Sequence, residues 1–93
     1  MARNRPTADW AAYAQQVGLA IQRRRIEVGL TQEYVAYAAG LTRSHYQLLE
    51  RGRGAADRSA NPSLLTLVAV AQVLQIELGD LLPKGAPDLT AGR

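Results

Sequence analysis

Hydrophobic residues recur at helical spacing through the first third of the chain. Between Thr7 and Gly29 one stripe repeats at intervals of three and four residues, in the series Trp10, Ala14, Val17, Ile21, Arg25 and Val28. One face of an α-helix repeats at this interval, so the pattern predicts an amphipathic helix over residues 7–28. Gly29 marks its expected end.

Two shorter helices are predicted next, each framed by a threonine and a glycine. Thr31 and Thr42 are good N-caps, and Gly40 and Gly52 are good stops, which gives one helix between Thr31 and Gly40 and a second over 42–51. A very tight turn joins the two helices. The residues expected to face inward are Val35, Ala36, Ala39, Leu41, Tyr46 and Leu49.

The second half of the chain begins with a stretch that lacks periodic apolar residues. GRGAADRSANP, residues 52–62, contains glycine, proline and asparagine and predicts a loop that is longer than most connections in helical bundles. A fourth helix follows, capped by Ser63 or Asn61, and a short fifth turn, ELGDLL, ends before Pro83. The inward stripe expected for the fourth helix is Leu64, Leu67, Ala71 and Leu74.

Composition favours one small helical domain. A chain of 93 residues has room for one core, because a chain of this size buries only about 60 to 65% of its unfolded surface. Hydrophobic residues make up 47% and aromatic residues 5%, with no Phe, a mixture that suits packed helices better than sheets. We therefore expect an all-α five-helix bundle over residues 7–82, with disordered ends at 1–6 and 83–93.

Several kinds of site and cellular location are not expected. Without cysteine there is no disulfide framework or thiolate metal site, and the single histidine cannot build an imidazole cluster, so we expect neither a metal nor a cofactor. The longest apolar stretch, LLTLVAVAQVL, is far shorter than the roughly 20 residues that a membrane span requires. The start of the chain lacks the long apolar run of an export signal. These features favour a soluble, cytoplasmic protein.

Basic residues are concentrated in two regions. The net charge is +3 and ten of the eleven basic residues are arginine, which lie mainly before residue 26 and between Arg43 and Arg58. The forked guanidinium group of arginine pairs well with phosphate and with guanine edges. The distribution suits a polyanionic partner, and a solvated basic face is the alternative.

The predicted helix 42–51 has an unusual outer face. If Leu41, Tyr46 and Leu49 face the core, the opposite side carries arginine, serine, glutamine, leucine and arginine at residues 43, 44, 47, 48 and 51. A major groove about 12 Å wide admits one helix, and within it arginine suits guanine and glutamine suits adenine. The glycine between the two short helices fits a helix-turn-helix, which a generic polar helix would not explain.

Two segments carry a family resemblance. GLTQEYVAYAAGLTRSHYQLLERG, followed by NPSLLTLVAVAQVLQIELGDLL, resembles the phage-repressor and Cro-type helix-turn-helix family, also called the XRE family, over roughly residues 17–82. The resemblance implies a five-helix domain of the lambda-repressor type that binds double-stranded operator DNA, usually as a dimer, with its third helix in the major groove. It implies a transcriptional regulator, either a repressor or an autoregulator. No small-molecule effector is evident.

The resemblance also assigns roles to individual residues. Groove-facing positions of the family match Arg43, Ser44, Gln47 and Leu48. Gln32 matches a glutamine that holds a phosphate, a role that the free N–H groups of a helix N-terminus favour. Arg51 and Arg53 match backbone-contacting positions, and we add Arg58 and His45 as phosphate contacts. Arg25 and Glu50 match an ion pair that ties the first helix to the third.

Several of these assignments have alternatives. Gln32 would otherwise be an ordinary first-turn residue, and Leu48 either packs against a thymine methyl group or covers the end of the bundle. His45 lies at the border between two faces, with no second ligand for a metal near it in the sequence. Tyr34 replaces the glutamate common in the family, which removes the reciprocal capping box at Thr31.

A second apolar stripe on the fourth helix predicts a homodimer. The helix carries Leu65, Ala69, Val73 and Ile76 in addition to its inward stripe. A helix on the outside of a small bundle needs only one apolar stripe, so a second copy of the chain is the expected cover. The alternative is that Trp10 and Tyr13 fold back over this stripe within one chain.

Two other functions compete with DNA binding. An enzyme has little support, since Ser44 and His45 would point apart on a helix and the chain has neither a glycine-rich phosphate loop nor a recognisable carboxylate pair. A protein-interaction module, such as an antitoxin or an adaptor with the same fold, is the stronger competitor. Such a module has no need for Gln32, Arg43, Gln47 and Arg51 together.

Overall fold

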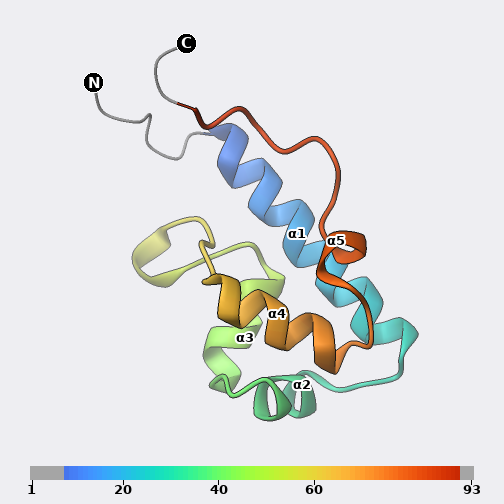
Figure 1. Ribbon diagram of the computed structural model, residues 1–93. Helices are drawn as coiled ribbons and strands as arrows, with labels where there is room; N and C mark the ends of the chain where they lie inside the picture. Colours follow the sequence, from blue (N-terminus) through green and yellow to red (C-terminus); the bar gives the residue numbers. More distant parts are fainter. Residues whose placement is uncertain (1–7, 91–93) are drawn as a thin grey trace.

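The part of the chain that the structure describes folds into five α-helices. The computed structural model describes residues 8–90, and within them the elements are α1 (Ala8–Glu27), α2 (Gln32–Ala38), α3 (Arg43–Glu50), the 3₁₀ turn η1 (Ala55–Asp57), α4 (Leu64–Val73) and α5 (Leu78–Leu81). The all-helical prediction is confirmed (Figure 1). The expected N-terminal arm, residues 1–6, and residues 91–93 of the expected tail lie outside the described residues. None of the helices in residues 8–90 has the length and apolar composition needed to cross a bilayer.

The helices begin and end at the capping residues that the sequence predicts. The hydroxyl oxygens of Thr31, Thr42 and Ser63 each accept a hydrogen bond from the backbone N–H three residues later, at 3.1, 3.0 and 3.1 Å. These bonds satisfy N–H groups that the first turn of a helix leaves without partners. Ser63 rather than Asn61 therefore caps α4, and Thr31 caps α2 even though Tyr34 cannot return a side-chain bond.

Gly40 makes the tight turn between α2 and α3. Its φ of 75° lies in the left-handed region, where a side chain would be strained. The turn closes with a hydrogen bond from the N–H of Leu41 to the carbonyl of Ala36, at 2.8 Å. The expected helix-turn-helix connection is present.

One core connects all five helices. It is built from α1 (Ala14, Val17, Ile21), α2 (Val35, Ala36), α3 (Tyr46, Leu49), α4 (Val70, Ala71) with Leu74 just after it, α5 (Leu81) and Ala60 of the loop. Within it, α3 contacts both α1 and α2, and α4 contacts α2 and α5. The helix predicted over residues 42–51 therefore packs against both α1 and α2 with its inner side.

Gly18 permits the close crossing of α1 and α3. A Cβ atom at Gly18 would lie 2.5 Å from the backbone oxygen of Glu50, so no larger residue fits without moving a backbone. Gly52 is similarly close to α1, where a Cβ would lie 2.6 Å from the Cα of Gln15. The close packing of α1 against the C-terminal end of α3 therefore depends on a glycine in each of the two segments.

The inward face of α4 differs from the predicted stripe. Leu64 was expected in the core but is 70% exposed, whereas Thr66, Val70, Ala71 and Leu74 are buried. Ser63 caps the helix, so Leu64 is its first residue. This first turn of α4 lies outside the core, and only the later turns pack against it. Helical periodicity gives the direction in which a residue points but not where the core ends.

Trp10 and Tyr13 do not cover the exposed part of α4. The indole Nε1 of Trp10 donates to the carbonyl of Ala60 at 3.1 Å, and the hydroxyl of Tyr13 donates to the carbonyl of Pro83 at 2.7 Å. These bonds hold the loop end and the start of the C-terminal segment against α1. Leu65 remains 78% exposed, so the alternative in which the two aromatic residues cover it is wrong.

The C-terminal segment returns toward the beginning of α1. Figure 1 shows the chain after α5 running back alongside the N-terminal half of α1. Gly85, Pro87 and Asp88 line a shallow hollow together with Asp9, Ala12, Tyr13 and Gln16 of α1. Residues 83–90 form no helix or strand.

Candidate nucleic-acid interface

The two sides of α3 are chemically different. Tyr46, Leu49 and Glu50 are buried against the bundle, while Arg43, Ser44, His45 and Arg51 are exposed and Gln47 and Leu48 are half-buried. All the residues predicted to face a groove therefore have side chains at or near the surface of the domain. The helix presents hydrogen-bond donors and acceptors outward because its buried residues, at spacings of three and four, occupy the inner side.

Arg43 already has a partner on α2. Its Nη2 lies 3.3 Å from Glu33 Oε2, and both side chains are well exposed. No local pattern in the sequence indicates this contact, because it depends on how the outer faces of α2 and α3 meet. A pair this exposed contributes little to stability, so Arg43 remains available to another anion.

Glu50 is the centre of a buried polar cluster. Its carboxylate accepts hydrogen bonds from Arg25 Nε at 2.6 Å, Arg25 Nη2 at 3.2 Å, the Tyr46 hydroxyl at 2.5 Å and Gln32 Nε2 at 2.9 Å. Arg25 also donates to the carbonyl of Leu30 at 3.0 Å. The cluster thereby connects α1, the turn before α2, α2 and α3.

The ionisation of this cluster follows from its contacts. Burial raises the pKa of Glu50, but hydrogen bonds from Arg25, Tyr46 and Gln32 more than offset it, and the pKa lies below its ordinary value. The hydrogen bond to Glu50 raises the pKa of Arg25. Burial and the bond to Glu50 raise the pKa of Tyr46, which stays protonated. Glu50 is therefore a carboxylate that only accepts hydrogen bonds.

Gln32 lies between this cluster and the outer face of α3. Its side chain is half-buried, and besides its bond to Glu50 its Oε1 accepts from Gln47 Nε2 at 3.4 Å. The family motif pointed to Gln32 as a phosphate contact, but no sequence signal indicated its partners. They depend on how α2 and α3 cross.

The loop after α3 is ordered by its own hydrogen bonds. Gly54 donates its N–H to the carbonyl of Arg58 at 2.7 Å, Ala60 donates to Gly52 at 2.9 Å, and Arg53 Nη2 pairs with Asp57 Oδ1 at 2.9 Å. At the tip, Ala56 and Asp57 have positive φ values of 54° and 60°, a conformation that costs energy in residues with side chains.

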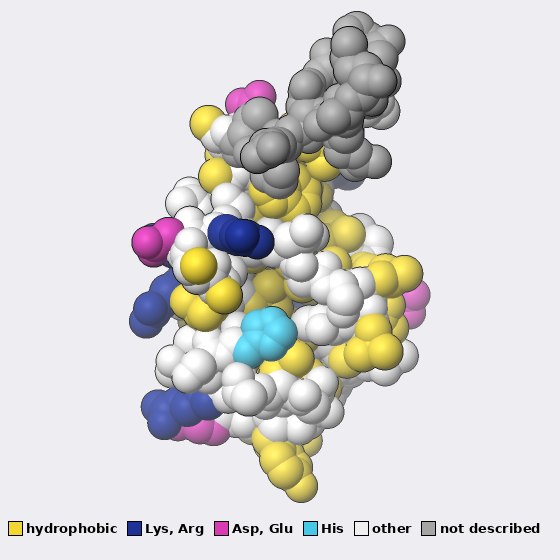
Figure 2. Space-filling model, turned by 90° about the vertical axis from the view of Figure 1, so that its left-hand side faces the viewer, with side chains coloured by type: hydrophobic (Ala, Val, Ile, Leu, Met, Phe, Trp, Pro, Cys, Tyr) yellow, Lys and Arg dark blue, Asp and Glu magenta, His cyan; other side chains and the backbone are white. Residues whose placement is uncertain are grey.

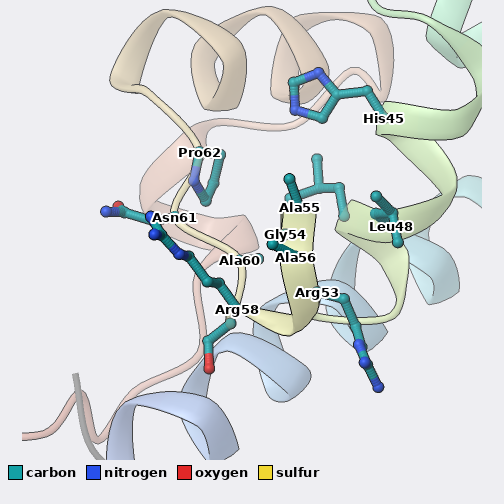
Figure 3. Close-up of a pocket in the computed structure, with 12 residues that line it drawn as sticks. His45, Leu48, Arg53, Gly54, Ala55, Ala56, Arg58, Ala60, Asn61 and Pro62 are labelled. Atoms are coloured by element: carbon teal, nitrogen blue, oxygen red, sulfur yellow. The ribbon is translucent and has the colours of Figure 1, made fainter.

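A hollow of about 580 Å³ separates this loop from α3. Figure 3 shows His45 and Leu48 on the α3 side, with Asn61 and Pro62 across the hollow and the Arg53 side chain pointing away from it. Arg58 is exposed on the loop side. The structure does not bring Arg53, Arg58 and His45 together into one cluster; it distributes them around the rim.

The same distribution is visible on the molecular surface. Figure 2 shows basic side chains at separate points around the histidine, some of them beside acidic side chains, with apolar patches between them. The Arg43–Glu33 and Arg53–Asp57 ion pairs place carboxylates beside two of the basic side chains. In residues 8–90 no group of three or more His, Asp or Glu side chains is arranged to hold a metal ion.

A second surface feature lies on α4. Leu64, Leu65 and Val68 are exposed by 70%, 78% and 37%, and we call these three residues the α4 patch. Ala69 is half-buried, and Val73 and Ile76 pack against the core of their own chain. Of the stripe predicted for a dimer, Leu65 is the most accessible residue.

Comparisons with known proteins agree with this geometry. A family model described as Helix-turn-helix matches residues 21–81. The uncharacterized HTH-type transcriptional regulator y4dJ of Sinorhizobium fredii (strain NBRC 101917 / NGR234) is 38% identical over 66 residues, which cover 71% of this chain and 78% of that protein. The family match spans α2, α3 and α4.

Solved structures have the same arrangement of helices. The restriction-modification controller protein C.AhdI from Aeromonas hydrophila is 33% identical, with a TM-score of 0.66 over 75% of this chain and 97% of that one. SinR, a master regulator for biofilm formation solved in complex with DNA, is 30% identical, with a TM-score of 0.62 over 72% of this chain and 98% of that one. The DNA-binding domain of SinR from Bacillus subtilis gives a TM-score of 0.63 at 28% identity, covering 75% of this chain and 94% of that one.

Proposed function

Because this chain belongs to the XRE-type helix-turn-helix family of DNA-binding transcriptional regulators, which are not enzymes, we propose that it reads an operator in double-stranded DNA through α3. We further propose that it acts as a homodimer and works as a repressor or autoregulator. The observation that carries the proposal is the outer face of α3, which exposes polar side chains while its inner side is anchored in the core.

The side chains of this face suit direct reading of bases. Arg43 has the two donors that match guanine, Gln47 has the donor and acceptor that match adenine, and Ser44 suits either. Leu48 is half-buried beside the hollow, where it can meet a thymine methyl group. Each well-made pair of this kind discriminates by about 1 to 3 kcal/mol against the wrong base.

Other residues around α3 would hold the phosphate backbone. Gln32 begins α2, Arg51 follows α3, Arg53 and Arg58 lie on the loop, and His45 stands at the rim of the hollow. Contacts to phosphate fix the position of a protein on the duplex but do not read its sequence. We therefore assign these five residues to positioning.

The α4 patch supports the homodimer. Three large apolar side chains exposed in one turn of a short helix favour burial against another apolar surface, and a two-fold pair covers both copies with the same residues. We propose Leu65 and Ala69, together with the neighbouring Leu64 and Val68, as its centre. Val73 and Ile76 pack against the core of their own chain, so only the exposed parts of their side chains would contact the second subunit.

Selection of bound sites from a random duplex library tests this function. A homodimer with one reading helix per subunit should enrich an inverted repeat whose half-sites are about one helical turn, or roughly 34 Å, apart. Enrichment of one undivided site would contradict the dimer. Failure to enrich any sequence would contradict base reading and favour a protein-interaction module that uses the α4 patch.

A further inference from the structure

We propose that the buried carboxylate of Glu50 sets the orientation of the Gln47 amide through Gln32, and so prepares Gln47 to read adenine. This inference rests on the proposed function, because it concerns the same reading face. Gln32 and Glu50 act in it as positioning residues that touch no base. We call the contacts that run from Glu50 through Gln32 to Gln47, from the core of the domain to its outer surface, the relay.

The first step is that Glu50 dictates which way the amide of Gln32 faces. The Glu50 side chain is only 3% exposed, and its Oε1 lies 2.9 Å from the end of the Gln32 side chain. A carboxylate without a proton accepts hydrogen bonds and donates none, so Gln32 must present its NH₂ group. The lowered pKa of Glu50 keeps the carboxylate in this form at neutral pH.

The second step is that Gln32 orients Gln47 in the same way. With its NH₂ group directed at Glu50, Gln32 has its carbonyl oxygen toward α3, 3.4 Å from the Gln47 side chain. A carbonyl oxygen only accepts, so Gln47 must present an N–H to it. At 3.4 Å the contact is longer than the usual range of about 2.7 to 3.2 Å for an N–H···O bond, and we expect it to shorten when DNA covers the face.

Gln47 retains one N–H donor and its carbonyl oxygen for a base. A glutamine amide has two N–H donors and one carbonyl oxygen, and the bond to Gln32 uses one donor. One donor and the carbonyl remain, which match the acceptor and donor that adenine presents in the major groove. Guanine presents two acceptors and would need two free donors. The relay therefore favours adenine over guanine.

Gln32 keeps a separate function in this arrangement. One N–H of its NH₂ group donates to Glu50, and the second N–H can donate to a phosphate oxygen. The same side chain can then hold the DNA backbone and orient a base-reading neighbour. Loss of Gln32 should consequently have two separable effects, one on all duplexes and one on a single base pair.

The relay can be tested first in the free protein. Gln32→Met keeps the length of the side chain but removes both hydrogen bonds, and Gln32→Ala gives a second variant if methionine disturbs folding. We expect either change to shift the side-chain amide resonances of Gln47 in ¹⁵N-correlated spectra. Gln72→Met, at an exposed position on α4, should leave them in place. Unmoved Gln47 amide resonances in a folded Gln32→Met protein would overturn the relay.

DNA binding tests what the relay does. The base pair read by Gln47 is identified as the one at which Gln47→Ala loses preference in a selected operator. Gln32→Met should reduce the preference at the same base pair about tenfold. The double variant, Gln32→Met with Gln47→Ala, should reduce this preference no further than Gln47→Ala alone. An equal loss on all four bases, with the preference intact, would reduce Gln32 to a phosphate contact and overturn the proposal.

The proposed function fails in a different way. If Gln47→Ala retains the full base preference, Gln47 is not a base contact, and that part of the proposed function is contradicted. The amide resonances of the free protein then decide the relay by themselves. The two failures therefore give different patterns of results.

Discussion

Helices α3 and α4 are similar in length and capping but opposite in what they expose. They have 8 and 10 residues, and each begins after a hydroxyl side chain that accepts a backbone N–H. The outer face of α3 carries Arg43, Ser44 and His45, whereas α4 exposes Leu64, Leu65 and Val68. A polar face is stable in water and suits a partner that offers charge and hydrogen bonds, while an apolar face gains by leaving water.

The inner sides of the two helices also differ. Glu50 on α3 is held by directional hydrogen bonds from α1 and α2, and Val70, Ala71 and Leu74 on α4 are held by apolar packing. Directional bonds fix the rotation and register of a helix more narrowly than packing does. The difference is appropriate for a face that must meet base edges within a fraction of an ångström.

The largest effect should come from removing the anchor of α3. Glu50→Ala leaves Arg25 with an unmatched charge beside the core, so the free energy of unfolding should fall by about 3 to 5 kcal/mol. Equilibrium unfolding in denaturant measures this free energy. Glu27→Ala removes the exposed partner of Arg24 and should cost less than about 1 kcal/mol. Equal losses in the two variants would show that the buried cluster does not anchor α3.

A charge on the outer face of α4 should weaken the homodimer. Leu65→Glu removes the burial of one large side chain, worth about 1.5 to 3 kcal/mol, so the dimer dissociation constant should rise about 10- to 100-fold. Sedimentation measures the constant, and operator binding should weaken with it. The variant should remain folded, because Leu65 is 78% exposed in the single chain.

A matched change on α1 provides the control for this comparison. Leu19→Glu introduces the same charge at another exposed leucine, which is 41% accessible, and should leave the dimer unchanged. A wild-type protein that sediments as a monomer at tens of micromolar would contradict the role of the α4 patch. An unchanged dimer in Leu65→Glu would contradict it as well.

Protonating Glu50 should produce a smaller effect than deleting it. The pKa of Glu50 is lowered in the folded state from its ordinary value of 4.5, so its contribution to stability is complete above that pH and is lost as pH falls through the folded pKa. The free energy of unfolding should decrease in acid below about pH 4.5. In Glu50→Gln this decrease should be shallower, and an identical slope in the two proteins would count against the ionised cluster.

The smallest effect should come from the contact between α2 and α3 at the surface. Glu33→Gln removes the carboxylate that Arg43 meets at 3.3 Å, and stability should change by less than about 0.5 kcal/mol. Duplex affinity should rise severalfold at low salt, since an anion next to the phosphate backbone is gone. Binding titrations measure this, and a fall in affinity would indicate that Glu33 itself contacts the DNA.

Local signals in the sequence were sufficient for the helix boundaries. Thr31, Thr42 and Ser63 cap their helices through bonds to the third following residue, which depend on neighbours in the chain and are therefore readable from it. The same holds for Gly40, whose positive φ makes the turn. The family motifs added the approach of Arg25 and Glu50, whose nearest atoms lie 2.6 Å apart.

Other features depend on tertiary geometry that periodicity does not contain. Leu64 fits a helical stripe but lies beyond the edge of the core, and Thr66 takes a buried place in α4. The contacts of Gln32 with Glu50 and Gln47 depend on the distance between α2 and α3. The order of the loop likewise comes from hydrogen bonds across it, such as the one from Ala60 to Gly52.

We propose that the outer face of α3 reads bases, while the arginines of the loop that follows it hold the phosphate backbone. Arg43→Ala and Arg53→Ala separate the two roles when affinity is measured for a selected operator and for every single-base variant of it. Arg43→Ala should lose about 1 to 3 kcal/mol on the operator and all preference at one base pair, while Arg53→Ala should weaken every duplex equally. If Arg43→Ala also weakens every duplex equally and keeps the full base preference, α3 does not read DNA through Arg43 and the account is wrong.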